Sequence, residues 1–188
     1  MLSPKDFVAR WQIDDNALVR FPKRKLRGLS MHQDDMEFLV QAGLPKSAAP
    51  FLSFDAGLMD ELPTVAFDWE LGEEFDCYRV IGSDGCGSPI AIDESHEGQI
   101  VCLDHDCRFE RILVNSSVRQ LAESLLAYRK MVKEAQAEFG PDAFLHGKIS
   151  LASREELRHE LLRIDKDALA PGCFWQSELQ NLEEKASG

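Results

Sequence analysis

With 188 residues, the chain is long enough to bury a sizeable core, and its composition, 44% hydrophobic and 29% charged, is typical of a globular protein. The net charge of −12 would repel the phosphate backbone of a nucleic acid, so we expect no nucleic-acid binding. No apolar run approaches the ~20 residues of a membrane span, and the first residues lack the apolar core of a signal peptide, so we expect a cytoplasmic protein without membrane contact.

Two short helices are predicted near the N-terminus. The sequence SPKDFVARW (3–11) begins like a helix, because serine is a preferred N-cap and proline suits the first turn. A second helix is expected over residues 31–42, and Gly43 can adopt the left-handed conformation that ends it. We expect the stretch 50–63 that follows to be an irregular connection held by apolar anchors.

From residue 64 the pattern changes to short runs rich in Val and Ile, separated by turn residues. A spacing of roughly ten residues per strand and turn is typical of an antiparallel meander. We therefore predict five strands in sequence order, over residues 64–69, 77–82, 88–93, 99–104 and 108–114.

Helical periodicity returns after the last of these strands. Ser117 with Gln120 forms a capping box that begins one helix, and Ser153 with Glu156 forms a second capping box that we expect to begin the next. The order of helices, strands and helices predicts an α+β fold with a central antiparallel β-meander flanked by N- and C-terminal helices. We expect a single domain over residues 1–188.

A glycine-rich stretch, GSDGCGS (82–88), directly follows a predicted strand. A Walker loop or a dinucleotide fingerprint needs a helix after its last glycine, and a Walker loop also needs a lysine. Here no lysine is present and another predicted strand follows. We therefore expect the glycines to supply positive φ angles in a strand-to-strand connection, and we expect no cofactor.

The five cysteines are an odd number without a CxxC pair, which favours reduced thiols over a disulfide framework. Cys102, His105 and Cys107 lie close together in CLDHDC (102–107), but zinc sites usually draw ligands from two separated pairs. We expect a turn capped by its aspartates, with His105 solvated and Cys102 in the core, and no metal. A thiol- or metal-dependent enzyme built on these three residues is the alternative.

Several motifs occur in a characteristic order along the chain. GLP (43–45) is followed by FLSFD (51–55), by a glycine-turned meander (78–106), and by a strand that enters a helix through Asn-Ser-Ser (112–131). RIDKDALAPGCFWQSEL (163–179) completes the order. Together these motifs resemble the SUKH superfamily, in its fourth immunity-protein branch, from Leu18 to Leu182.

This resemblance implies a SUKH-like α+β fold and a bacterial immunity protein that binds and neutralises a toxin domain of a polymorphic or contact-dependent toxin system. It brings no catalytic residues, so we expect no enzyme activity. A regulatory protein-binding scaffold without a toxin partner is an alternative. The basic stretch PKRKLRG (22–28) and the turn CLDHDC (102–107) are not features that can be assigned to the family pattern. The residues that match it are scaffold positions: Gly82, Pro89, Ile90, Asp93, Gly98, Asp104, Asn115, Ser116 and Ser117.

Acidic residues are concentrated between Lys46 and Arg108, where fourteen Asp and Glu stand against one Arg or Lys, Arg79. Such a run is either a solvated face or a surface that steers a basic partner, here the cognate toxin domain. If charge carries binding, we expect the contact to involve seven carboxylates and one aromatic anchor: Asp60, Glu61, Asp68, Trp69, Glu70, Glu73, Glu74 and Asp76. Trp69 fits a core position equally well.

Overall fold

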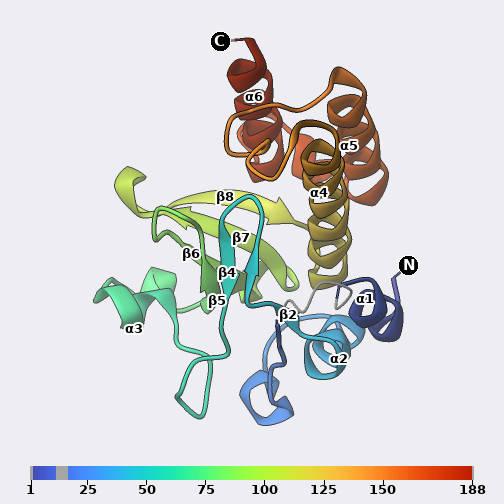
Figure 1. The fold of residues 1–188 in the computed structure, drawn as a ribbon. Coiled ribbons are helices and arrows are strands. Elements are labelled where there is room, and N and C mark those ends of the chain that lie inside the picture. Colours follow the sequence, from blue (N-terminus) through green and yellow to red (C-terminus); the bar gives the residue numbers. More distant parts are fainter. Residues whose placement is uncertain (1, 12–16, 188) are drawn as a thin grey trace.

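The computed structural model describes residues 2–11 and 17–187, which form an antiparallel sheet flanked by helices (Figure 1). This confirms the predicted α+β class. Within these residues the helices are α1 (Pro4–Trp11), α2 (Gln33–Gln41), α3 (Val65–Trp69), α4 (Val118–Phe139), α5 (Leu151–Ile164) and α6 (Phe174–Ser187). None of them is both long enough and apolar enough to cross a membrane.

The main sheet contains six strands among the described residues, in the spatial order β3-β4-β5-β6-β7-β8, and all neighbours are antiparallel. A second sheet pairs β1 (Leu18–Val19) with β2 (Leu44–Pro45). The strands of the main sheet are β3 (Ser47–Ala48), β4 (Leu52–Phe54), β5 (Tyr78–Ser83), β6 (Pro89–Asp93), β7 (Gln99–Asp104) and β8 (Glu110–Asn115).

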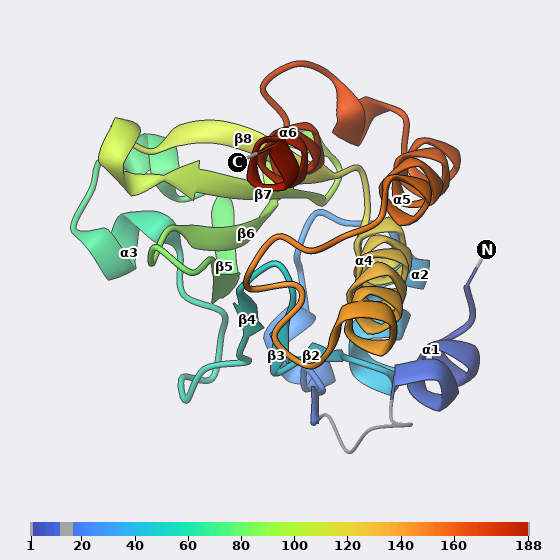
Figure 2. The same cartoon turned by 45° about the horizontal axis from the view of Figure 1, so that its top comes forward.

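The two faces of the sheet are covered to different extents. Alternate side chains of β7 point to opposite faces. Ile100 and Cys102 join the large core that the sheet forms with α1, α2, α4, α5 and α6, whereas Val101 and Leu103 join a much smaller core with α3. In Figures 1 and 2, α3 lies at the end of the sheet away from α4 and α5. The smaller core therefore belongs to a separate, thinly covered part of the fold.

Most predicted elements are confirmed, but the segment 64–69 is a helix and not a strand. Thr64 caps this helix, because its side chain accepts a hydrogen bond from the backbone N–H of Phe67 at 3.1 Å. Val65 and Trp69, four residues apart, pack on the sheet while Phe67 remains exposed. The Val- and Trp-rich composition favours a strand, but the cap and the helical spacing determine the outcome.

Two further predictions need correction. The stretch 50–63 is not wholly irregular, because β4 lies within it and pairs with both β3 and β5. The helix α5 begins earlier than predicted: Ser150, not Ser153, is its N-cap and accepts a hydrogen bond from the N–H of Ser153 at 3.2 Å. The capping box of Ser117 with Gln120 is confirmed.

A buried hydrogen-bond network joins the end of β8 to the C-terminal helices. The Asp165 carboxylate, after α5, accepts from the backbone N–H of Ser116 at 2.6 Å, from the Ser116 hydroxyl at 3.0 Å and from the Asn115 amide at 3.2 Å. The Asn115 side-chain oxygen in turn accepts from the Trp175 indole of α6 at 2.9 Å. Asn115 and Trp175 are fully buried, so water cannot replace these bonds.

A second buried carboxylate, that of Asp93, fixes the turn between β6 and β7. It accepts from the backbone N–H and hydroxyl of Ser95 at 3.0 and 2.6 Å, and from the Arg111 guanidinium at 2.8 Å. His96 Nδ1 lies 2.9 Å from the same group. Burial alone would raise the pKa of Asp93, but the hydrogen bonds from Ser95 and Arg111 and the charge of Arg111 lower it below its usual range.

The substitution Asp165→Ala is expected to lower the free energy of unfolding by about 3 kcal/mol, because it removes an acceptor from the buried Asn115 amide and from the half-buried Ser116. Urea unfolding followed by circular dichroism measures this change. The matched control is Asp167→Ala, an exposed carboxylate two residues away. Equal unfolding midpoints for the two variants would contradict the role given to the network.

The substitution Asp93→Asn is expected to lower the free energy of unfolding at neutral pH, and this loss should become smaller as the pH falls. Because the pKa is lower in the folded state, the carboxylate stabilises the fold above its unfolded pKa of about 3.9. This contribution is lost as the pH falls through the folded pKa. Urea unfolding of both proteins at neutral pH and in steps down to pH 3 gives the difference in stability, and a difference that stays constant would show the prediction wrong. The exposed Asp142→Asn is the control.

Candidate functional site

The glycine-rich loop connects β5 to β6, and its three glycines have two different structural roles. Only Gly87 of the three has a positive φ, at 95°, so the expectation that all of them supply positive φ is wrong. A Cβ on Gly82 would lie 2.1 Å from the Ser53 carbonyl oxygen, and one on Gly85 would lie 2.9 Å from the Phe51 Cβ. These two glycines permit close approach of neighbouring segments. The loop leads into β6, as predicted, and not into a helix.

The turn CLDHDC spreads its candidate ligands apart. The Asp104 carboxylate caps the turn, accepting from the N–H groups of Asp106 at 3.0 Å and Cys107 at 3.3 Å. His105 is only partly exposed to solvent, with 31% of its side chain accessible, and its Nδ1 lies 2.9 Å from the hydroxyl of buried Ser88. Over residues 2–11 and 17–187, no three His, Cys, Asp or Glu side chains converge to hold a metal ion. The expected absence of a metal stays a prediction.

The thiols of this turn are held in their protonated form. Burial, followed by the charge of Asp84, raises the pKa of Cys102 to about 12. A hydrogen bond with Asp104 and the charge of that carboxylate raise the pKa of Cys107. A thiolate is the reactive form of cysteine, so these surroundings oppose nucleophilic chemistry at Cys102 and Cys107.

The predicted acidic residues lie on one continuous segment, residues 60–76, hereafter the acidic segment. It comprises the end of a loop, α3 and a 3-10 turn at Glu73–Phe75. All seven predicted carboxylates are on exposed residues. Among the described residues, only two of them have a side-chain partner: Asp60 lies 3.6 Å from Arg24, and Asp76 accepts from Thr64 at 3.1 Å. The remaining carboxylates face solvent.

Trp69 has features of both a core residue and a partner-binding residue. Its ring packs edge-on against Phe109, with centroids 6.0 Å apart, as part of the smaller core. The residue is nevertheless only half-buried, and it lines a groove described below. Its assignment as a partner-binding residue stays a prediction, as do those of the carboxylates.

The loop 55–63 runs into the acidic segment: Asp60 and Glu61 belong to both, whereas residues 55–59 are not among the predicted site residues. It leaves and re-enters the sheet at adjacent residues of β5, because Asp55 N–H donates to the Ile81 carbonyl at 3.0 Å and Val80 N–H donates to the Pro63 carbonyl at 2.8 Å. Lys25, only 4% exposed, holds the loop by donating to two of its carbonyls at 2.5 and 2.7 Å. The basic stretch 20–28 thus contributes a structural tether, which its charge alone could not reveal.

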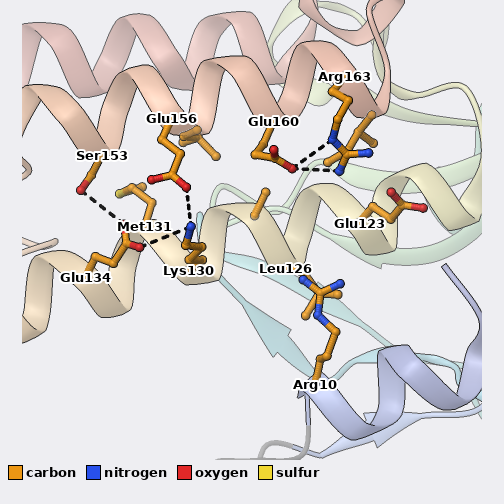
Figure 3. Close-up of a pocket in the computed structure, with 13 residues that line it drawn as sticks. Arg10, Glu123, Leu126, Lys130, Met131, Glu134, Ser153, Glu156, Glu160 and Arg163 are labelled. Atoms are coloured by element: carbon orange, nitrogen blue, oxygen red, sulfur yellow. Dashed lines mark hydrogen bonds and ion pairs between the residues drawn. The ribbon is translucent and has the colours of Figure 1, made fainter. Parts of the chain in front are cut away.

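A separate hollow of about 260 Å³ lies between α4 and α5 (Figure 3). Its floor includes Leu126, and charged side chains form its rim. Lys130 pairs with Glu156, and Arg163 pairs with Glu160 at 2.8 Å. Because the fold already pairs these charges, we assign no ligand to this hollow.

A larger polar hollow of about 630 Å³ lies beside the N-terminus of α4. Arg119 in its wall pairs with Asp34 at 3.2 Å and with Asp35 at 3.1 Å. His96, also in the wall, contacts the buried Asp93. Because these two side chains already have partners within the fold, we assign no ligand here either.

Comparison with known proteins identifies a family but no individual relative. Neither the search of curated proteins nor that of solved structures returned a significant match. A family model, described as SUKH-4 immunity protein, matches residues 6–181, which include the whole sheet and the network around Asp165. With nearly the entire sequence covered by that match, the chain belongs to the SUKH-4 immunity protein family.

Proposed function

We propose that this protein binds a toxin domain of a polymorphic or contact-dependent toxin system and neutralises it by covering its active cleft. Membership of an immunity protein family supports a toxin as the partner in general. In this proposal the protein acts in the cytoplasm, as one domain, without catalysis or a cofactor.

The acidic segment is the surface that we propose for binding, because most of its carboxylates are exposed and form no side-chain hydrogen bond or ion pair with the other described residues. Its apolar residues Val65 and Trp69 pack on the sheet, whereas its carboxylates contribute little to folding contacts. A surface that is not needed by the fold and carries one sign of charge is suited to a partner of opposite charge. We therefore propose a basic toxin domain, such as one whose own substrate is a nucleic acid.

The acidic segment also carries the apolar contact area that a specific interface needs. Phe67 on α3 is 65% exposed. Trp69, two residues further on, is half-buried with part of its surface accessible. Large aromatic residues surrounded by polar groups are the usual centres of binding energy in protein interfaces. Charge would then accelerate encounter, and the aromatic side chains would hold the complex.

Charge reversal tests the surface. The triple variant Glu70→Lys, Glu73→Lys and Glu74→Lys is expected to lower the association rate with the toxin by about tenfold or more at low salt, because it removes the steering field. High salt should reduce this difference by screening. Surface plasmon resonance measures the rate, with a purified candidate toxin domain as the ligand.

The matched control makes the same change in net charge elsewhere, with Glu138→Lys, Glu155→Lys and Glu184→Lys on α4, α5 and α6. These residues are exposed and distant in sequence from the acidic segment. If both triple variants slow association equally, net charge acts without a defined surface, and the assignment of the acidic segment is wrong.

A growth assay tests the function itself. Cells that express the toxin domain are expected to grow when they also express this protein and to stop growing when they do not. The charge-reversed triple should protect poorly, and the control triple should protect well. Equal survival with and without the protein would contradict toxin immunity and favour the regulatory scaffold.

A further inference from the structure

A groove of about 450 Å³ lies between the loop 55–63 and α3, beside β4 and β5. Its apolar lining includes Pro63, Trp69 and Val80. Two carboxylates also line it: Asp55 stands at the start of the loop and Asp68 stands on α3. The groove thus combines an aromatic ring with acidic groups contributed by both of its walls.

The walls of the groove are held in place before any partner arrives. Both ends of the loop are hydrogen-bonded to adjacent residues of β5, and the buried ammonium group of Lys25 holds the carbonyls of Ala56 and Gly57. The Asp55 carboxylate accepts from the Gly57 N–H at 2.6 Å, which orients it. A preformed site loses little conformational entropy when it binds.

In the described part of the chain, the carboxylates of the groove form no ion pair. Within the described residues, no basic side chain pairs with Asp55 or Asp68 at 4.0 Å or less, although Lys46 also lines the groove. Nearby guanidinium groups are engaged elsewhere: Arg79 pairs with Glu94 at 2.5 Å, and Arg24 pairs with Asp60. Partial burial raises the pKa of Asp68 above its usual range.

We propose that this groove receives an arginine side chain of the partner, with its guanidinium between Asp55 and Asp68 and its plane against Trp69. This inference rests on the proposed function and specifies its anchor contact. Arginine fits better than lysine, because a planar guanidinium stacks on an indole and donates to two carboxylates at once. Apolar side chains that line the groove, Pro63 and Val80, would pack around it.

The chemistry can be tested without the toxin, using N-acetyl-arginine methylamide as the probe. Titration into the full-length protein is expected to shift the NMR signal of the Trp69 indole N–H in a saturable manner. The analogue with citrulline has nearly the same shape but no charge, and it should bind at least fivefold more weakly. Equal shifts from the two probes, or no shift at Trp69, would overturn the proposal.

Variants separate this groove from the rest of the acidic segment. Asp68→Asn is expected to weaken binding of the arginine probe at least fivefold, whereas Glu73→Gln, outside the groove, should leave it unchanged. Lys46→Gln removes a positive charge that lines the groove and should strengthen binding. Thermal unfolding of each variant verifies that the fold is intact. If Asp68→Asn binds the probe as the parent protein does, the groove is not an arginine site.

The toxin complex then distinguishes the two proposals. If the toxin domain binds and Asp68→Asn leaves its dissociation rate unchanged, the groove proposal fails and toxin immunity stands. If the arginine probe binds but no toxin domain is neutralised, the proposed function fails and the chemistry of the groove stands. An increase of about tenfold or more in the dissociation rate of Asp68→Asn would support both.

Discussion

The carboxylate of Asp165 lies where the sheet passes into its longest described helix, and it accepts hydrogen bonds from the backbone and side chains of that junction. Asp165 follows α5, and the Asn115 that it contacts also receives the Trp175 indole of α6. Three helices are thereby positioned against the last strand through a network whose Asn115, Asp165 and Trp175 are buried. A buried polar network of this kind is favourable only when every member has a partner, so it also specifies one arrangement of the helices.

The hydrogen-bond network around Asp165 stabilises the packing on one face of the sheet. The large core, which includes Ile100, Leu121 and Trp175, stabilises the fold. The opposite face carries only a small core around Val101 and Leu103, covered by α3. Substitutions on the exposed side of α3 therefore touch few of the contacts that the fold needs. Such separation allows a surface to be specialised for binding at little cost in stability.

Much of the fold could be predicted because the strong local signals agree with the tertiary structure. The strands β5, β6 and β7 were predicted within a residue of their observed bounds, since turn residues separate short apolar runs there. The helix α3 was predicted as a strand, because Val, Phe and Trp favour strands and only the cap at Thr64 indicates a helix. The start of α5 was misplaced because Ser150 and Ser153 both suit an N-cap, and local sequence could not distinguish them.

The candidate site was predictable only in part. The density of carboxylates drew attention to the acidic segment, but the groove is formed by residues that the pairing of β4 with β5 brings together. Asp55 stands apart from the main run of acidic residues, and Lys25 belongs to a basic stretch that gave no sign of a buried tether. Burial and long-range contacts determine the roles of Asp55 and Lys25, and the local composition of the sequence reveals neither.

The closure of the loop 55–63 on two adjacent residues of β5 has a consequence for how this family could diversify. Because the chain leaves and returns at nearly the same point, residues can be added or removed between the two anchors without changing the register of the sheet. Doubling the length of such a loop costs only about 0.6 kcal/mol in closure entropy. Relatives with longer or shorter versions could therefore follow changes in their targets by exchanging this loop, while the scaffold behind it stays as it is.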